Sequence, residues 1–216
     1  QGPQGPAEGG AEVNDLTSRY TEALMNTFGP PKLALVRGEG THVWDADGKE
    51  YVDLLAGIAV NSLGHGHPAL VGAITEQLQT LGHVSNFFTT GPQVELAEAL
   101  LRLLDGGVAA QGGGKVFFTN SGTEAIECAL KTARKYTGRE NVISFTNGWH
   151  GQTLGSLAIT GNGHHRGGAG ISLPGATRMP YDGYMGDDVD TTNYLDKVLS
   201  DSSSGVDKPA AVIVET

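Results

Sequence analysis

The sequence predicts an α/β protein in which helices cover a largely parallel sheet. After residue 115, apolar β-type runs alternate with amphipathic helical segments, and this order is typical of parallel βαβ units. The chain has 216 residues, of which 38% are apolar and 18% charged, a composition typical of globular proteins. This length suits one or two domains with a substantial hydrophobic core.

The first part of the chain is predicted to be a tail followed by a helix. Residues 1–10 read QGPQGPAEGG, so we expect residues 1–12 to be a disordered tail or the remnant of an expression tag. Asp15 can cap a helix that runs to Phe28 and is stopped by Gly29-Pro30-Pro31.

A β-hairpin and two helices are expected next. Residues 33–37 are extended, and strand-like runs flank the turn signal Asp47-Gly48, which predicts a hairpin. Pro68 suits the first turn of a helix that ends near Leu81. A second helix is predicted from Gln93 to Leu104.

Residues 115–138 carry the most informative pattern in the chain. The apolar run 116–119 predicts a strand, and the turn Asn120-Ser121-Gly122-Thr123 then opens a helix that Gly138 ends. The first-turn N–H groups of such a helix lack intrahelical partners and carry partial positive charge. The turn therefore predicts an anion site suited to a phosphate, although a plain helix cap is the simpler local interpretation.

The remaining segments continue the alternation. Residues 141–145 are predicted to be a strand, and 148–160 a turn that leads into a short helix. A glycine-rich loop follows over 161–175, Asp190 caps a helix to Leu199, and residues 209–215 form a buried β run.

Charge and cysteine content exclude several classes of protein. A formal charge of −10 argues against broad nucleic-acid binding, because no basic stripe is present. No apolar run has the length of a membrane span, and no signal peptide is visible. The single Cys128 excludes a disulfide framework and fits a reducing cytoplasm, so we expect a cytoplasmic protein without nucleic-acid or membrane partners.

Histidine pairs and aspartates do not predict a metal site. His65 with His67, and His164 with His165, lack cysteine or carboxylate partners at ligand spacing. Asp187, Asp188 and Asp190 lack the later ligands of a calcium loop.

Three segments together resemble the class III (ω-amino) aminotransferases, which are fold-type I enzymes that use pyridoxal 5′-phosphate. The segments are LLAGIAVNSLGHGHPAL (54–70), NSGTEAIECALKTAR (120–134) and SFTNGWHGQTLGSLAITGN (144–162). The resemblance implies that residues 13–62 are the N-terminal segment of the small domain. It also implies that 63–216 are the first part of the cofactor-binding large domain, an α/β/α sheet that is incomplete at its C-terminus. It further implies a homodimer.

The resemblance also assigns cofactor-binding residues. The turn that includes Ser121 would hold the cofactor phosphate, and Trp149 would stack on the pyridine ring. The residues that match the family's cofactor site are Ser121, Gly122, Thr123, Trp149, His150 and Glu215.

Substrate-binding positions favour one of two subfamilies. Residues 13–136 resemble acetylornithine aminotransferases, whereas 142–216 resemble diaminobutyrate–2-oxoglutarate aminotransferases. Gln152 and Phe28 stand where acetylornithine enzymes usually have Arg and Tyr, and Val60 matches the site entrance. A neutral amide binds a carboxylate more weakly than a guanidinium does. The resemblance thus implies ping-pong transfer of the terminal amine of 2,4-diaminobutyrate to 2-oxoglutarate, with N-acetylornithine as the alternative substrate.

No lysine of this chain matches the family's catalytic lysine. That lysine, and the aspartate that pairs with the pyridine nitrogen, lie in the family beyond the position of Thr216. The resemblance therefore implies no catalytic residue within this chain and a natural chain that continues. A catalytically inactive fragment is the alternative of another class. A Rossmann-type nucleotide binder is disfavoured because the dinucleotide-binding glycines are missing.

Overall fold

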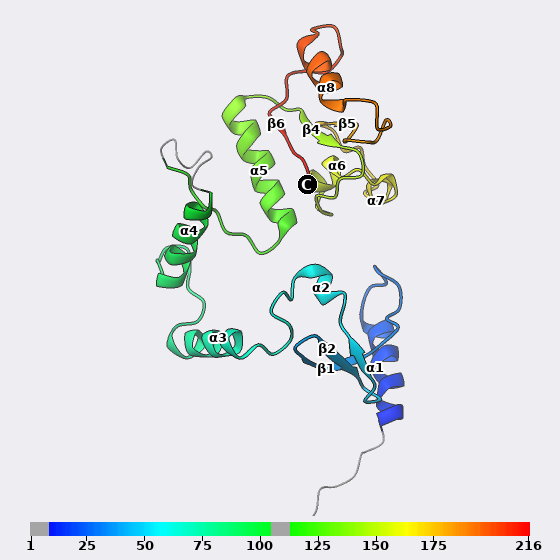
Figure 1. Cartoon of the computed structure of the whole chain (residues 1–216), viewed down its shortest axis with the longest axis vertical. Helices are drawn as coiled ribbons and strands as arrows, with labels where there is room; N and C mark the ends of the chain where they lie inside the picture. The colour runs from blue at the N-terminus through cyan, green and yellow to red at the C-terminus, as the bar shows by residue number, and fades with distance from the viewer. Residues whose placement is uncertain (1–8, 105–112) are drawn as a thin grey trace, which may run out of the picture. The chain divides into compact units, whose positions relative to one another are not determined.

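The structure, a computed structural model, describes residues 9–104 and 113–216. The chain divides into two compact units, Gln1–Thr89 and Thr90–Thr216 (Figure 1). This division lies later in the chain than the predicted domain boundary at residues 62 and 63, which stays a prediction. Among the described residues, none of the helices has the length and apolar character needed to span a membrane.

The first unit contains the predicted hairpin within a three-stranded antiparallel sheet. The strands β1 (Leu35–Glu39), β2 (His42–Asp45) and β3 (Glu50–Val52) pair in that order. Asp45 closes the turn, because its carboxylate accepts hydrogen bonds from Lys49 N at 2.9 Å and from the Tyr51 hydroxyl at 2.8 Å. The Tyr51 hydrogen bond, more than any other contact, holds the pKa of Asp45 below its usual value.

The first helix differs from its prediction at both ends. Helix α1 spans Gly9–Ala23, so residues 9–12 are helical and Phe28 lies beyond the helix. Ala11 and Glu12 extend the helix because both are good helix formers, whereas Asn26 and Thr27 have low helix propensity and do not continue it. The rest of the predicted tail, residues 1–8, lies outside the described residues.

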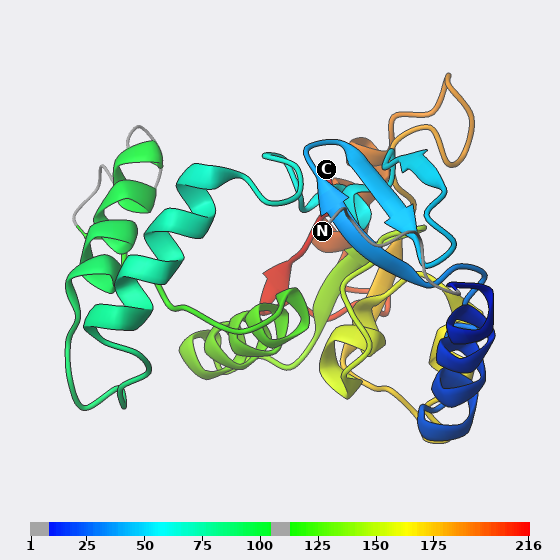
Figure 2. The same cartoon turned by 90° about the horizontal axis from the view of Figure 1, so that it is seen from below.

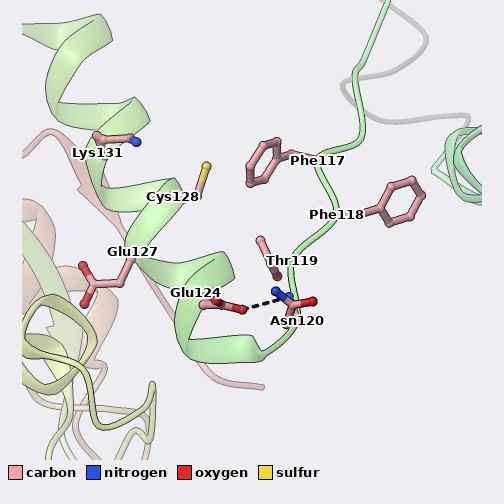
Figure 3. A pocket seen from close by; sticks show the side chains of 8 residues that line it. All are labelled: Phe117, Phe118, Thr119, Asn120, Glu124, Glu127, Cys128 and Lys131. Carbon is pink, nitrogen blue, oxygen red and sulfur yellow. Dashed lines mark hydrogen bonds between the residues drawn. The ribbon is translucent and has the colours of Figure 1, made fainter. Parts of the chain in front are cut away.

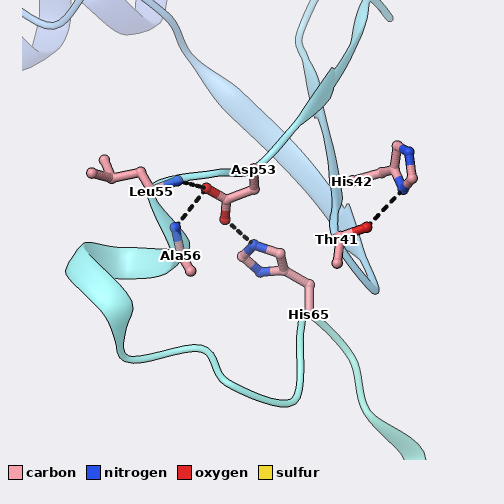
Figure 4. Close-up of polar contacts among 6 residues, drawn as sticks. All are labelled: Thr41, His42, Asp53, Leu55, Ala56 and His65. Carbon is pink, nitrogen blue, oxygen red and sulfur yellow. Dashed lines mark hydrogen bonds and ion pairs between the residues drawn. The ribbon is translucent and has the colours of Figure 1, made fainter.

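A left-handed turn follows the sheet of the first unit. Helix α2 (Ala56–Ala59) has positive φ at every residue, and α3 (Pro68–Thr80) begins at the predicted proline. Asp53 accepts hydrogen bonds from the N–H groups of Leu55 and Ala56 at 3.1 and 2.8 Å, and it pairs with His65 Nε2 at 2.8 Å (Figure 4). These contacts tie the turn to the chain on both sides of it.

The second unit is built on a three-stranded parallel sheet. Its order, β5-β4-β6, confirms the prediction of parallel pairing. The elements of this unit are α4 (Gly91–Leu103), α5 (Gly122–Thr137), β4 (Val142–Phe145), α6 (Leu154–Ile159), α7 (Gly163–Gly167), β5 (Ala176–Met179), α8 (Thr191–Ser200) and β6 (Ala211–Val212).

The core of the second unit lies between α5, α6 and the sheet. Leu130 of α5, Val142 of β4 and Ile159 of α6 pack together with almost no exposure to solvent. Figure 2 shows α5 running beside β6 and β4. Burial of three large aliphatic side chains, each about 1.5–3 kcal/mol, makes this cluster the main hydrophobic contribution to the unit.

Local structure in this unit departs from the prediction in four places. The predicted buried β run 209–215 is a strand only over Ala211–Val212, and Val212 is half-exposed. The extended segment 116–119 pairs with no strand among the described residues, and a strand without a hydrogen-bonded neighbour is not a strand. The predicted loop 161–175 contains α7, which Asn162 caps by accepting hydrogen bonds from His164 N and His165 N. Strand β5 was not predicted, because Ala176–Met179 carries a charged residue and lacks a β-branched run. The predicted helix after Asp190 is confirmed as α8, with Asp190 as its N-cap.

Candidate functional site

The first turn of α5 is closed by a reciprocal capping arrangement. Ser121 has extended backbone dihedrals, and its Oγ accepts a hydrogen bond from Glu124 N at 3.3 Å. Glu124 Oε2 in turn accepts a hydrogen bond from Asn120 N at 2.8 Å (Figure 3). A residue with a short polar side chain at the N-cap, followed three positions later by Glu, is the sequence signature of this arrangement. The predicted helix start is therefore confirmed.

The same turn offers two backbone donors to an anion. Gly122 N and Thr123 N belong to the first two helical residues and have no intrahelical acceptor. A Cβ atom placed on Gly122 would meet nothing within 4 Å, so the space beside this backbone is open. The helix dipole adds partial positive charge at this end. A phosphate group therefore fits the first turn of α5 in both charge and space.

The loop between β4 and α6 carries three of the predicted site residues, Trp149, His150 and Gln152. Trp149 N donates a hydrogen bond to Glu215 Oε2 at 2.6 Å, so the carboxylate that follows β6 holds this loop. The Trp149 side chain is half-exposed. The sequence separation of the two residues is large, and only the parallel pairing of β4 with β6 brings them together.

His150, the next residue of this loop, is buried. Its side chain is 8% exposed, and its backbone N–H donates to Thr160 Oγ1 at 3.1 Å. Burial lowers the pKa of the His150 imidazole, against an opposing effect of the Glu215 charge, so the ring is neutral at pH 7. His150 Nε2 is buried without a hydrogen-bond partner among the described residues. The predicted role of His150 in cofactor binding stays a prediction.

A hydroxyl network connects the first turn of α5 to this loop. Thr123 Oγ1 lies 2.8 Å from Thr153 Oγ1 and 2.6 Å from Ser156 Oγ. A Cβ atom on Gly151 would clash with Thr123, so the loop passes the first turn at a distance that only glycine allows. The structure thus brings Ser121, Gly122 and Thr123 to the loop of Trp149, and Glu215 binds the same loop.

Gln152 shares a neighbour with Trp149. Its side-chain amide lies 3.3 Å from His165 Nδ1, and the indole of Trp149 packs edge to face against the His165 ring with centroids 5.0 Å apart. In the sequence, His165 was considered together with His164 as a metal ligand, and partners at ligand spacing are missing. The place of His165 inside the predicted loop 161–175, next to His164, gave no signal for this contact.

The other two predicted substrate residues belong to the first unit. The side chains of Phe28 and Val60 are 93% and 73% exposed. Val60 directly follows the left-handed turn α2, and its N–H donates to Ala56 O at 2.8 Å. The positions of both residues at a substrate entrance stay predictions.

Among the cavities of the described second unit, two lie beside predicted site residues. One of about 460 Å³ lies against α5 and is lined on its open side by Phe117 and Phe118 (Figure 3). Another of about 250 Å³ lies between the end of β4 and Glu215. Its lining residues are Phe145, Thr146, Asn147, Gly148, Tyr181, Glu215 and Thr216.

Comparisons with known proteins agree on one family. Residues 25–216 match the family model described as aminotransferase class-III. The chain is 53% identical over 154 residues to the acetylornithine aminotransferase of Corynebacterium efficiens, covering 70% of this chain and 38% of that protein. It is 44% identical over 204 residues to the acetylornithine aminotransferase of Methanopyrus kandleri, covering 94% of this chain and 47% of that protein.

A solved structure gives the same result for the fold. The taurine:2-oxoglutarate aminotransferase from Bifidobacterium kashiwanohense, in complex with PLP and glutamate, superposes with a TM-score of 0.81 at 27% identity. The match covers 98% of this chain and 49% of that one, so the chain spans about half the length of the proteins it resembles. The predicted fold class, the α/β fold of the fold-type I transferases, is confirmed. The chain belongs to the class III aminotransferases.

Proposed function

We propose that the protein is a pyridoxal 5′-phosphate-dependent aminotransferase that moves the terminal amine of N-acetylornithine to 2-oxoglutarate. The observation that carries the proposal is the open first turn of α5, where two unpaired N–H groups suit a phosphate. Relatives named acetylornithine aminotransferase, which align over up to 94% of this chain, support the substrate. The predicted homodimer and cytoplasmic location remain predictions.

The residues present fit one side of a bound cofactor. The N–H groups of Gly122 and Thr123 would hold its phosphate, and Ser121 would keep the turn in place through its cap. Trp149, half-exposed and fixed by Glu215 through its backbone, would stack on the pyridine ring. When bound, pyridoxal 5′-phosphate supplies the carbonyl that receives the amine and the conjugated ring that accepts electrons. The chain's own residues supply binding and orientation.

Gln152 favours a second candidate function, transfer from 2,4-diaminobutyrate. Its side-chain amide lies in the loop before α6. Both this amide and the Trp149 ring contact His165. A neutral amide cannot form with a substrate carboxylate the bidentate ion pair that a guanidinium forms. This position is where acetylornithine enzymes usually have arginine, so it is the residue at which the two substrates are best distinguished.

A steady-state assay of the gene product that contains these residues tests the proposal. Glutamate formation from 2-oxoglutarate would be measured with N-acetylornithine and with 2,4-diaminobutyrate as amine donors. We expect a higher kcat/KM for N-acetylornithine. Gln152→Arg should raise that value by about tenfold, because a guanidinium binds a carboxylate more strongly by on the order of 1–3 kcal/mol.

Gln93→Arg, on the exposed surface of α4, is the matched control for added charge and should change neither donor's kinetics. A higher kcat/KM for 2,4-diaminobutyrate would transfer the proposal to the second candidate. If no glutamate forms with either donor, both candidate functions are overturned.

A further inference from the structure

Among the carboxylates on the helices and strands of the described second unit, Glu127 accepts the most hydrogen bonds from outside its own element. It lies one helical turn after Thr123 on α5 and is partly buried. Figure 3 shows its side chain on the side of α5 away from Phe117, directed at the neighbouring segment. No motif of the sequence analysis assigned it a role.

A single oxygen of Glu127 caps the helix that follows the Trp149 loop. Oε1 accepts hydrogen bonds from Gly155 N at 2.8 Å and from Ser156 N at 3.1 Å. The N-cap residue of α6, Thr153, makes no cap hydrogen bond with its own side chain. The carboxylate of α5 therefore satisfies first-turn donors that α6 leaves open.

The same oxygen also holds the hydroxyl network of the site. Thr153 Oγ1 donates to Glu127 Oε1 at 2.6 Å, and Thr153 Oγ1 lies 2.8 Å from Thr123 Oγ1. Thr123 is the second residue of the turn that is proposed to hold the phosphate. Glu127 and Thr123, from two successive turns of α5, thus both hydrogen-bond to the Thr153 hydroxyl at the end of the loop.

Glycine allows this close approach at two positions. A Cβ atom on Gly155 would clash with the Glu127 carboxylate, and one on Gly151 would clash with Thr123. Burial raises the pKa of Glu127, but the hydrogen bonds from Thr153, Ser156 and Gly155 outweigh it and hold the pKa below its usual value. The carboxylate is therefore charged at neutral pH, and its Oε1 accepts three hydrogen bonds.

We propose that Glu127 is a positioning residue that fixes the Trp149 loop against the first turn of α5, so that the ring and phosphate contacts form together. The inference rests on the proposed function. Glu127 does not touch the cofactor in this account. It acts through Thr153 and the N-terminus of α6, which fix the end of the loop.

Two effects of the carboxylate have opposite signs, and this makes the proposal testable. A negative charge one turn from a phosphate site repels the phosphate, so charge alone predicts tighter binding when Glu127 is neutralised. Positioning predicts weaker binding, because the loop loses three hydrogen bonds at one point. The direction of the change therefore separates the two effects.

Binding to the whole 216-residue chain is measured by equilibrium dialysis with pyridoxine 5′-phosphate and with pyridoxine. Neither probe has an aldehyde, so surface lysines do not react with them. We expect Glu127→Ala to raise the Kd for pyridoxine 5′-phosphate by about tenfold or more, because the loop loses its hydrogen bonds to a charged group. Glu127→Gln keeps an acceptor oxygen and should restore a large part of that affinity.

Glu140→Ala is the matched control, because it removes an exposed carboxylate just after α5. Trp44→Phe makes Trp149 the sole tryptophan, and its fluorescence quenching by the probe should weaken in Glu127→Ala in step with the Kd. Tighter binding by Glu127→Ala, or a lower melting temperature with unchanged Kd, would overturn the positioning role. If the unmodified chain binds both probes equally, the proposed function fails instead.

Discussion

At the scale of single residues, backbone strain is concentrated in one turn of the first unit. Ala56, Ile58 and Ala59 have φ values of 48°, 63° and 60°, in the left-handed region that favours glycine. Each such residue costs roughly 1–2 kcal/mol. Asp53 offsets part of this cost through its bonds to Leu55 N and Ala56 N (Figure 4). Strain of this kind clusters at functional sites, which agrees with the predicted entrance role of Val60.

Replacement of one strained residue by glycine tests this description. Ala59→Gly should leave the free energy of unfolding unchanged or raise it slightly, because glycine adopts the left-handed conformation without a steric cost. Ala73→Gly in α3 makes the same chemical change at an exposed helical position and should lower that free energy by about 1 kcal/mol. Both values come from urea unfolding. Equal destabilisation by the two changes would show that residue 59 is not strained.

Single residues also mark where sequence reasoning stopped. The helix start at Ser121 and Gly122, and the anion site expected there, could be predicted from the polar turn before an amphipathic helix, since that pattern has a local physical cause. The contacts of Glu127 with Thr153, and of Trp149 with Glu215, span elements that only the fold brings together. Nothing in the spacing of these residues along the chain predicts them.

At the scale of elements, helix α5 organises the second unit. Its N-terminus is capped by Ser121, its C-terminus ends at the left-handed Gly138, and Leu130 joins the core between them. Both ends were predicted correctly because caps depend on local sequence. The strand predicted at 116–119 was wrong because strand pairing depends on a neighbour that local sequence does not specify.

The cap of α5 is expected to contribute measurably to stability. Ser121→Ala removes the acceptor of Glu124 N and should lower the free energy of unfolding by about 1 kcal/mol. Ser202→Ala, in the exposed loop after α8, makes the same change away from any helix N-terminus and should have almost no effect. Urea unfolding followed by circular dichroism measures both. A loss no larger than that of Ser202→Ala would remove Ser121 as the cap.

At the scale of the whole molecule, family membership and fold agree with the sequence prediction, whereas substrate choice depends on few residues. The family model covers residues 25–216, including all three segments on which the resemblance was recognised. The substrate preference predicted from the sequence rested on Gln152 and Phe28. These two residues were given more weight than the resemblance of the longer segment 13–136 to acetylornithine aminotransferases. The relatives named acetylornithine aminotransferase align across both parts, and this favours the alternative that the sequence placed second.

The first turn of α5 is proposed to bind the phosphate of the cofactor, and the proposed function depends on this contact. The most direct measurement is the ratio of the Kd values of pyridoxine and pyridoxine 5′-phosphate for the unmodified chain, measured by equilibrium dialysis. Charge-assisted bonds from Gly122 N and Thr123 N predict that the phosphate tightens binding by about tenfold or more. Equal affinity for the two probes would contradict this proposal, and the turn would then be only a helix cap.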